Sequence, residues 1–372
     1  MARQMLRAGL SSSDLADLRA PRDFPAVSLI MPTHRTPPDN KTDPILLRNL
    51  LDHAAVRLRG ENLPHGVADE VIDGLNRAAT SVDLNHAAEA LAVFAATGSE
   101  HHSFTLPYVH PAPRVAIGLS FAVRDLVAAR EHVWDYWVLS MSEQPTRLWS
   151  GAGEWLRESN AGGFPMAYSD GLPPERGAVP RPRRADWLKN DRREQFFRHV
   201  LGEMATVLAR DSRPLVVTGV KRYLAYFEQL APAAVQSRFI GFVDGSFDHA
   251  SAPELAGWVA PVLTAERERW QHDAIGRLEV ARSERLLASG LTQVWDLAGA
   301  GQVRELLAEE GYLSPARESD GHLLPPGDPG GAPVDDAVEV IMDGVLNGGG
   351  EVIFVPDGSL EPYGQIAASL RY

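Results

Sequence analysis

The sequence contains no cysteine, and this absence removes several kinds of chemistry at once. Disulfide bonds, thiolate-ligated metal sites and a cysteine nucleophile are all excluded. Long apolar runs are missing too, because none reaches the roughly 18 residues that a membrane-spanning helix needs. The first 24 residues hold Ser, Asp and Arg among their apolar positions and form no secretory signal. We therefore expect a cytoplasmic protein with no membrane partner.

Several sequence motifs that are typical of common enzyme classes are absent as well. The chain has no G-x-x-x-x-G-K-[ST] loop, and no predicted strand is followed by G-x-G-x-x-G, so nucleotide-binding loops of these two types are excluded. It has no G-x-S-x-G elbow of a serine hydrolase. None of its 12 histidines falls in an H-E-x-x-H metal motif. We expect no cofactor and no histidine-ligated metal.

The composition is that of a globular protein with more than one domain. The chain has 372 residues, of which 44% are hydrophobic and 23% are charged. A chain of this length divides into two or three domains of roughly 100 to 150 residues each. The net charge of −13 argues against a surface covered by nucleic acid, but it does not exclude a local basic patch.

Hydrophobic periodicity predicts that strands and helices alternate along much of the chain. A helix over 43–58, with Asp43 as N-cap and Pro44 at its first position, is the clearest single element. A hairpin over 137–149 and a strand, helix and strand over 214–243 predict a partly parallel sheet. The other expected elements are strands at 27–31, 91–95, 351–355 and 366–370, helices at 67–79, 337–346 and from 192, a helix over 251–288 that breaks at Pro261, a linker at 110–114, and an irregular Gly/Pro loop at 319–336.

A basic segment inside this acidic chain is the strongest local signal. Eight cations face few acids between residues 175 and 198: Arg176, Arg181, Arg183, Arg184, Lys189, Arg192, Arg193 and Arg198. The prolines around 180–182 are expected to keep the first arginines extended, ahead of a helix that begins at Arg192. Trp187 is placed to stack on a base or to anchor the segment. Contact with the phosphates of a folded RNA and an ordinary charged loop both remain open.

Two acidic residues after a predicted strand form a second candidate site. Asp244 and Asp248 follow the apolar run that ends at Val243. Carboxylates at the end of a strand can gather around a divalent cation. The Asp-Gly pair at 244–245 is equally typical of a plain turn.

The order of these elements resembles a known family. Four stretches carry the resemblance: VSLIMPTHRTPPDNKTDPILLRNLL, WVLSMSEQPTRLWSG, RPLVVTGVKRYLAYF and GGGEVIFVPDGSLEPYGQIAASLRY. The chain is similar to the bacterial relatives of archaeo-eukaryotic peptide-chain release factor one and of the ribosome-rescue factor Pelota, in their third bacterial subfamily. The resemblance implies an α/β fold in three domains: an N-terminal domain (1–112), a middle domain with an RNase H-like sheet (113–252), and a C-terminal α/β sandwich like that of kink-turn-binding ribosomal proteins (253–372).

The resemblance also implies a position for a reactive loop. Catalytic release factors carry Gly-Gly-Gln there, and in this chain the same order of elements places Gly162, Gly163 and Phe164. A phenylalanine cannot exchange the hydrogen bonds that orient a hydrolytic water. We therefore expect a non-catalytic factor in ribosome rescue, hibernation or quality control.

The partners that the resemblance implies are the ribosome, its RNA, tRNA and a translational GTPase. One alternative is an enzyme, either a peptidyl-tRNA hydrolase or a metal-dependent nuclease that uses Asp244 and Asp248. A module that binds another protein through the acidic surface is a third reading.

Overall fold

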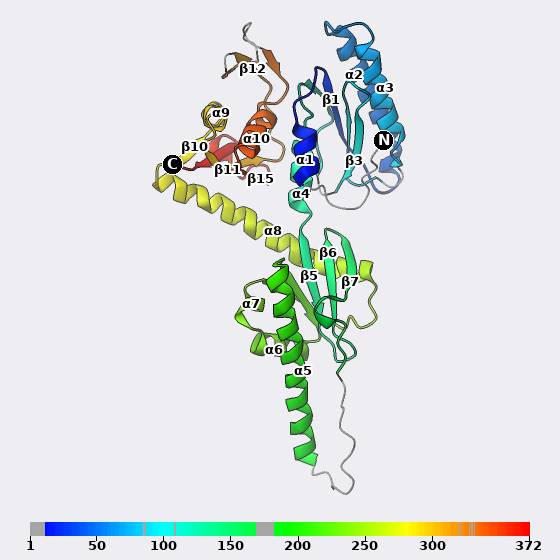
Figure 1. Ribbon diagram of the computed structural model, residues 1–372, viewed down its shortest axis with the longest axis vertical. Helices are drawn as coiled ribbons and strands as arrows, with labels where there is room; N and C mark the ends of the chain where they lie inside the picture. The colour runs from blue at the N-terminus through cyan, green and yellow to red at the C-terminus, as the bar shows by residue number, and fades with distance from the viewer. Residues whose placement is uncertain are drawn as a thin grey trace. The chain divides into compact units, whose positions relative to one another are not determined.

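The computed structural model describes residues 12–84, 87–107, 109–168, 182–319, 321–326, 328, 330 and 332–372. It divides into two compact units, shown in Figure 1. The discontinuous unit comprises Met1–Val133 and Trp270–Tyr372, and the inserted unit comprises Trp134–Arg269. Both combine helices with sheets, so the predicted α/β class is confirmed. No helix among the described residues is long and apolar enough to cross a membrane.

The first sheet of the discontinuous unit has the strand order β3-β2-β1-β4. Its neighbouring strands are antiparallel: β1 (Ala26–Pro32), β2 (Ala90–Ala95), β3 (His101–Leu106) and β4 (Arg114–Gly118). The central strands are apolar runs because both faces of the sheet are covered. The sheet continues to residue 118, beyond the boundary expected at 112, because β4 pairs with β1.

Two helices cover one face of this sheet, as Figure 1 shows: α2 (Asp43–Gly60) and α3 (Val67–Thr80). Their buried stripes include Leu47, Leu50 and Leu75 at helical spacing. The N-cap of α2 is Thr42, one residue before the predicted Asp43. The Asp43 carboxylate instead accepts hydrogen bonds from the backbone N–H and the ring Nδ1 of His34, each at 2.8 Å.

The second sheet of the discontinuous unit has the order β10-β16-β11-β15. Only the β11 and β15 pair is parallel. One face packs on α9 and α10, and the other packs on the part of α8 that follows residue 270. The bounds are α8 (Ala252–Ser283), β10 (Leu287–Ser289), α9 (Leu291–Gly299), β11 (Val303–Glu309), α10 (Ala337–Asn347), β15 (Glu351–Val355) and β16 (Ile366–Leu370).

One hydrophobic core joins the two sheets of the discontinuous unit. Side chains of α1 (Ser12–Arg19) and α4 (Arg124–His132) contribute to it, together with Phe94 from β2 and Met342 from α10. Ion pairs reinforce the joint: Arg19 Nε lies 2.7 Å from Asp343 Oδ1. Because the core is continuous, the N-terminal and C-terminal thirds of the chain form a single unit.

The inserted unit is built on a five-stranded sheet of order β7-β6-β5-β8-β9. The predicted hairpin is β5 (Asp135–Ser140) with β6 (Arg147–Ala152), extended by β7 (Trp155–Ser159). The strands β8 (Leu215–Gly219) and β9 (Phe239–Asp244) run parallel to β5. Three helices cover one face: α5 (Pro182–Arg210), α6 (Lys221–Leu230) and α7 (Ala233–Gln236).

Three predicted elements differ in the structure. Helix α5 begins at Pro182 rather than Arg192, because proline is well tolerated in the first turn of a helix. Helix α8 continues through Pro261 and ends at Ser283. Pro261 and Gly257, whose carbonyl the proline frees, are both exposed, so water can satisfy that carbonyl. The Gly/Pro loop contains the strands β13 (His322–Leu324) and β14 (Ala332–Val334), which pair with the preceding strand β12 (Ala316–Ser319) in a small sheet.

Candidate nucleic-acid interface

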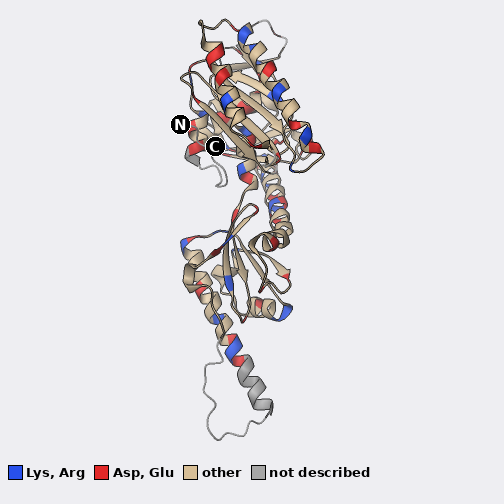
Figure 2. Ribbon diagram, turned by 90° about the vertical axis from the view of Figure 1, so that its right-hand side faces the viewer, with Lys and Arg blue, Asp and Glu red and all other residues tan. Residues whose placement is uncertain are grey.

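The charge of the chain is divided unequally between its two units. The inserted unit carries as many Lys and Arg as Asp and Glu, 17 of each, so the other unit carries the whole net charge of −13. Figure 2 colours these residues along the ribbon, with basic segments on α5. A phosphate backbone would therefore be repelled far less by the inserted unit than by the discontinuous one.

Helix α5 carries most of the predicted basic residues. Arg183, Arg184, Trp187 and Lys189 lie on its helical backbone, so Arg183 and Arg184 are not extended as expected. Arg176 and Arg181 lie outside the described residues. Contact of these six side chains with RNA stays a prediction.

Three further basic residues of α5 have described side chains. Arg192 has no ion-pair partner among the residues that the structure describes, and its side chain is partly exposed. Arg198 Nη2 lies 2.6 Å from Glu194 Oε1, one turn away on the same helix, and is exposed. An exposed pair of this kind contributes roughly 0.3–0.5 kcal/mol, so it does not prevent Arg198 from contacting a phosphate.

Arg193 takes part in a cluster around one carboxylate. Its Nε lies 2.9 Å from Oε1 of Glu143, which sits in the turn between β5 and β6. Arg222 Nη2, at the start of α6, donates to the same oxygen at 2.9 Å, and the Tyr223 hydroxyl donates to it at 3.2 Å. The hydrogen bond to the Tyr223 hydroxyl, helped by the charges of Tyr223 and Glu143, outweighs burial and raises the pKa of Arg222 above its ordinary value. The cluster has two cations and one anion, so it is net positive.

Gly162, Gly163 and Phe164 form a tight turn that packs against α5 within the inserted unit. Ala161–Gly163 is a short 3-10 turn in which both glycines have positive φ, +62° and +77°. The ring of Phe164 is 3% exposed and lies in the core beneath α5. Its side chain is therefore part of the protein core and is not displayed to a ligand.

The two glycines of this turn predict a measurable difference. A Cβ on Gly162 would lie 2.7 Å from Val207 Cγ2, whereas a Cβ on Gly163 would lie 3.6 Å from its nearest neighbour, Met166 Cε. Both alanine variants incur the left-handed strain of about 1–2 kcal/mol. We expect Gly162→Ala to cost about 1–2 kcal/mol more than Gly163→Ala because of the added overlap, measured by urea unfolding. Equal costs would show that close packing is not what requires Gly162.

The predicted acidic site lies at the end of β9. Asp244 is exposed, and its carboxylate lies 3.9 Å from the ammonium of Lys221. That positive charge competes with a cation for the carboxylate. In the part of the chain that is described, no group of three His, Asp or Glu residues, Asp248 included, is placed to hold a metal ion.

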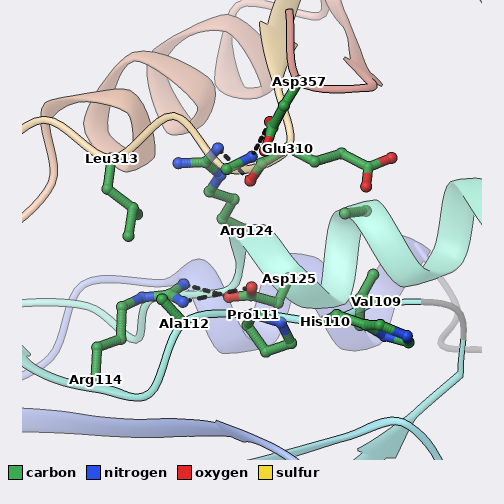
Figure 3. Close-up of a pocket in the computed structure, with 12 residues that line it drawn as sticks. Val109, His110, Pro111, Ala112, Arg114, Arg124, Asp125, Glu310, Leu313 and Asp357 are labelled. Carbon is green, nitrogen blue, oxygen red and sulfur yellow. Dashed lines mark hydrogen bonds and ion pairs between the residues drawn. The ribbon is translucent and has the colours of Figure 1, made fainter.

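The discontinuous unit has a pocket of about 340 Å³ between α4, the segment 109–114 and the segment 310–313. Figure 3 shows its two arginines turned toward partners. Arg114 pairs with Asp125, and Arg124 donates to the backbone carbonyls of Glu309 and Glu310 at 2.7 and 2.8 Å. Both arginines are therefore held by protein groups, and Arg124 links α4 to the end of β11.

Sequence reasoning missed the residues that surround Arg193. Glu143 is separated from it by 50 positions, and Arg222 by 29, so only the parallel pairing of β5 with β8 brings them together. The sequence offered one signal. Glu143 and Arg222 each lie just beyond the end of a predicted strand, and the ends of parallel strands meet at the same edge of a sheet.

Comparisons with known proteins agree with the resemblance. Residues 135–302 match the model of the bacterial archaeo-eukaryotic release factor family 3. The match covers the inserted unit and extends through α9, and over these residues the resemblance is confirmed. A search of curated proteins gives no match.

Solved structures of this kind superpose only loosely on the chain. The archaeal translation termination factor aRF1 is 15% identical over 96% of both chains, with a TM-score of 0.25. Ribosome-bound archaeal Pelota, in a model with ABCE1, is 16% identical over 76% of this chain and 77% of its own, with a TM-score of 0.40. Dom34 of S. cerevisiae, a translation termination-like factor interacting with Hbs1, is 14% identical over 76% and 79%, with a TM-score of 0.39. No conclusion about this chain follows from superpositions this loose.

Proposed function

We propose that this chain is a ribosome-associated translation factor of the release-factor and Pelota type. It binds ribosomal RNA and acts without catalysis in ribosome rescue, hibernation or quality control. The observation that carries the proposal is the family match over residues 135–302, a segment that contains the whole of the basic helix α5. The same family relationship extends the proposal to tRNA and a translational GTPase as partners, in the cytoplasm.

Two features of the inserted unit support binding without hydrolysis. Phe164 stands where the family's glutamine is expected, and its ring is buried in the core. The cations of α5 lie on the unit that carries no net charge, so they act on a phosphate without a surrounding acidic field. The proposed role of the unit is therefore to hold RNA through its phosphates.

The proposal predicts that the chain sediments with ribosomes and is released by salt. Each neutralised phosphate contributes a slope of about −0.7 to −0.9 in log affinity against log salt. The triple variant Arg181→Ala, Arg183→Ala, Arg184→Ala is expected to lose at least tenfold in affinity at 100 mM KCl and to have a slope shallower by about two to three. The measurement is sedimentation through a sucrose cushion over a series of KCl concentrations.

A matched control has the same change of net charge on the discontinuous unit. Arg48, Arg59 and Arg77 are exposed residues of α2 and α3, and alanine at all three should leave ribosome binding within about twofold. An equal loss in this control would mean that net charge alone governs binding. If the wild-type chain does not sediment with ribosomes at 50 mM KCl, the proposed function is wrong.

A further inference from the structure

The junction around Glu143 brings more hydrogen-bond donors to one carboxylate oxygen than that oxygen satisfies. Arg193 Nε, Arg222 Nη2 and the Tyr223 hydroxyl all approach the same oxygen, Oε1, at 2.9, 2.9 and 3.2 Å. The approach of Arg193 has poor hydrogen-bond geometry, so its buried Nε–H has no hydrogen-bond partner among the described residues. An unsatisfied guanidinium N–H beside an engaged carboxylate is a costly arrangement in the unbound protein.

A phosphodiester can take the place of the carboxylate in this arrangement. It carries one negative charge on two non-bridging oxygens, and arginine pairs bind such groups through parallel N–H···O bonds. Because a phosphodiester is not tethered to the turn between β5 and β6, it can place its two oxygens so that the three donors are divided between them and the Nε–H of Arg193 gains an acceptor. The three donors come from two helices, α5 and α6, which lie on the same face of the sheet in Figure 1.

The site is accessible from solvent. The side chain of Arg222 is 56% exposed and that of Arg193 is 25% exposed. The Glu143 backbone is fixed, because its carbonyl accepts a hydrogen bond from Tyr168 N at 2.9 Å. When the side chain of Glu143 rotates away into water, the turn and both helices therefore keep their positions.

We propose that Arg193, Arg222 and Tyr223 form a binding site for one phosphodiester of RNA, and that Glu143 occupies this site as an internal substitute when RNA is absent. The proposal rests on the proposed function and adds a specific subsite to it. Glu143 lowers the affinity for RNA, because it must be displaced before the phosphate enters. Binding at this subsite requires no change in the backbone of the sheet.

The first test removes the charge of Glu143 and keeps its shape. Glu143→Gln should bind a short structured RNA about 3 to 10 times more tightly than the wild type, measured by fluorescence anisotropy at fixed salt. The matched control is Glu158→Gln, which removes the same charge from the same unit, since Glu158 pairs with Arg147 at 3.7 Å on β6 and β7. The control accounts for the general electrostatic gain, so an equal gain in both variants overturns the proposal.

The second test asks whether the gain depends on the arginines. Arg222→Ala should weaken RNA binding and make the salt slope shallower by about 0.7 to 0.9, which is one phosphate contact. Adding Glu143→Gln to Arg222→Ala should restore little, because the site that the glutamine frees is no longer complete. A full gain in the double variant overturns the proposal.

The outcomes separate this inference from the proposed function. If the wild type binds RNA with a steep salt dependence and Glu143→Gln brings no specific gain, only the phosphate subsite is wrong. If no variant binds RNA at low salt, both ideas fail. If inorganic phosphate stabilises Glu143→Gln against thermal unfolding while RNA does not bind, the site takes free phosphate and the assignment to RNA is overturned.

Discussion

Replacing Arg124 with leucine is expected to destabilise the discontinuous unit by roughly 3–5 kcal/mol. Arg124 is 2% exposed, at the start of α4. Its Nη2 donates to the carbonyls of Glu309 and Glu310, and its Nη1 contacts the carbonyl of Tyr312 and lies 3.2 Å from Asp336 Oδ2. Leucine removes every one of these donors. The carbonyl of Glu309 keeps the hydrogen bond from Tyr312 N–H, but the partly buried carbonyls of Glu310 and Tyr312 lose the donor that Arg124 supplies.

The measurement is hydrogen exchange in urea, followed separately for peptides of each unit. Peptides of α4, β11 and α10 should lose protection at lower urea in Arg124→Leu, while peptides of β5 and β8 should not change. The control, Arg48→Leu, changes an exposed arginine of α2 and should shift stability by less than about 0.5 kcal/mol. Similar losses in both variants would contradict the role assigned to Arg124.

Stability of the discontinuous unit is expected to fall as pH rises from about 5 to about 8. Glu339, in the first turn of α10, accepts hydrogen bonds from the backbone N–H groups of Val123 and Arg124 at 2.6 and 3.1 Å. Burial, together with the charge of Asp343, raises the pKa of Glu339 to about 8. Burial likewise raises the pKa of Glu131, at the end of α4, to about 8.

The sign follows from proton linkage. Between the ordinary carboxyl pKa of 4.5 and about 8, the folded unit binds more protons than the unfolded chain, so its free energy of unfolding falls with rising pH. Below that window both states are protonated and the contribution is fully present. The free energy of unfolding of Glu339→Gln should depend less on pH than that of the wild type. Any deficit of the variant relative to the wild type should therefore be smaller at pH 8 than at pH 5.

Urea midpoints measured at half-unit steps of pH test this expectation. Glu61→Gln changes an exposed residue at the end of α2 and should leave the profile of the wild type unaltered. A wild-type profile that is flat or rises between pH 5 and 8 would show that these carboxyls are not held protonated in the folded unit.

The elements that sequence reasoning located correctly are those with a strong local pattern. The strand β1 and the hairpin of β5 and β6 are bounded apolar runs, and α10 carries an apolar stripe with Asp336 as a hydrogen-bonded N-cap. In each case burial and local propensity favour the same structure, so the sequence alone suffices.

The elements that sequence reasoning misplaced all involve proline. Pro182 starts a helix and Pro261 lies within one, where exposure of the helix face reduces the penalty. The strands β13 and β14 flank prolines in a segment with no periodicity, and their pairing with β12 is a tertiary effect. Proline limits the backbone locally but does not determine which of its tolerated positions the fold uses.

The candidate site was predictable only in part. The basic character of α5 can be predicted from the sequence, because it depends only on which residues the segment contains. The contacts of Arg193 with Glu143 and of Glu143 with Arg222 join three separate elements, and no local pattern encodes them. Likewise, the buried ring of Phe164 follows from packing beneath α5 and not from its neighbours in sequence.

The continuous core between the two sheets has a consequence for synthesis on the ribosome. The strands β1 and β2 are translated early, but one face of their sheet is completed by α10, which is translated more than 200 residues later. The inserted unit, a contiguous segment, can fold in the interval because it needs no later residue. Until α10 is translated, the sheet that contains β1 and β2 keeps part of its apolar face exposed. A nascent chain that stalls before residue 337 would therefore present that face to chaperones.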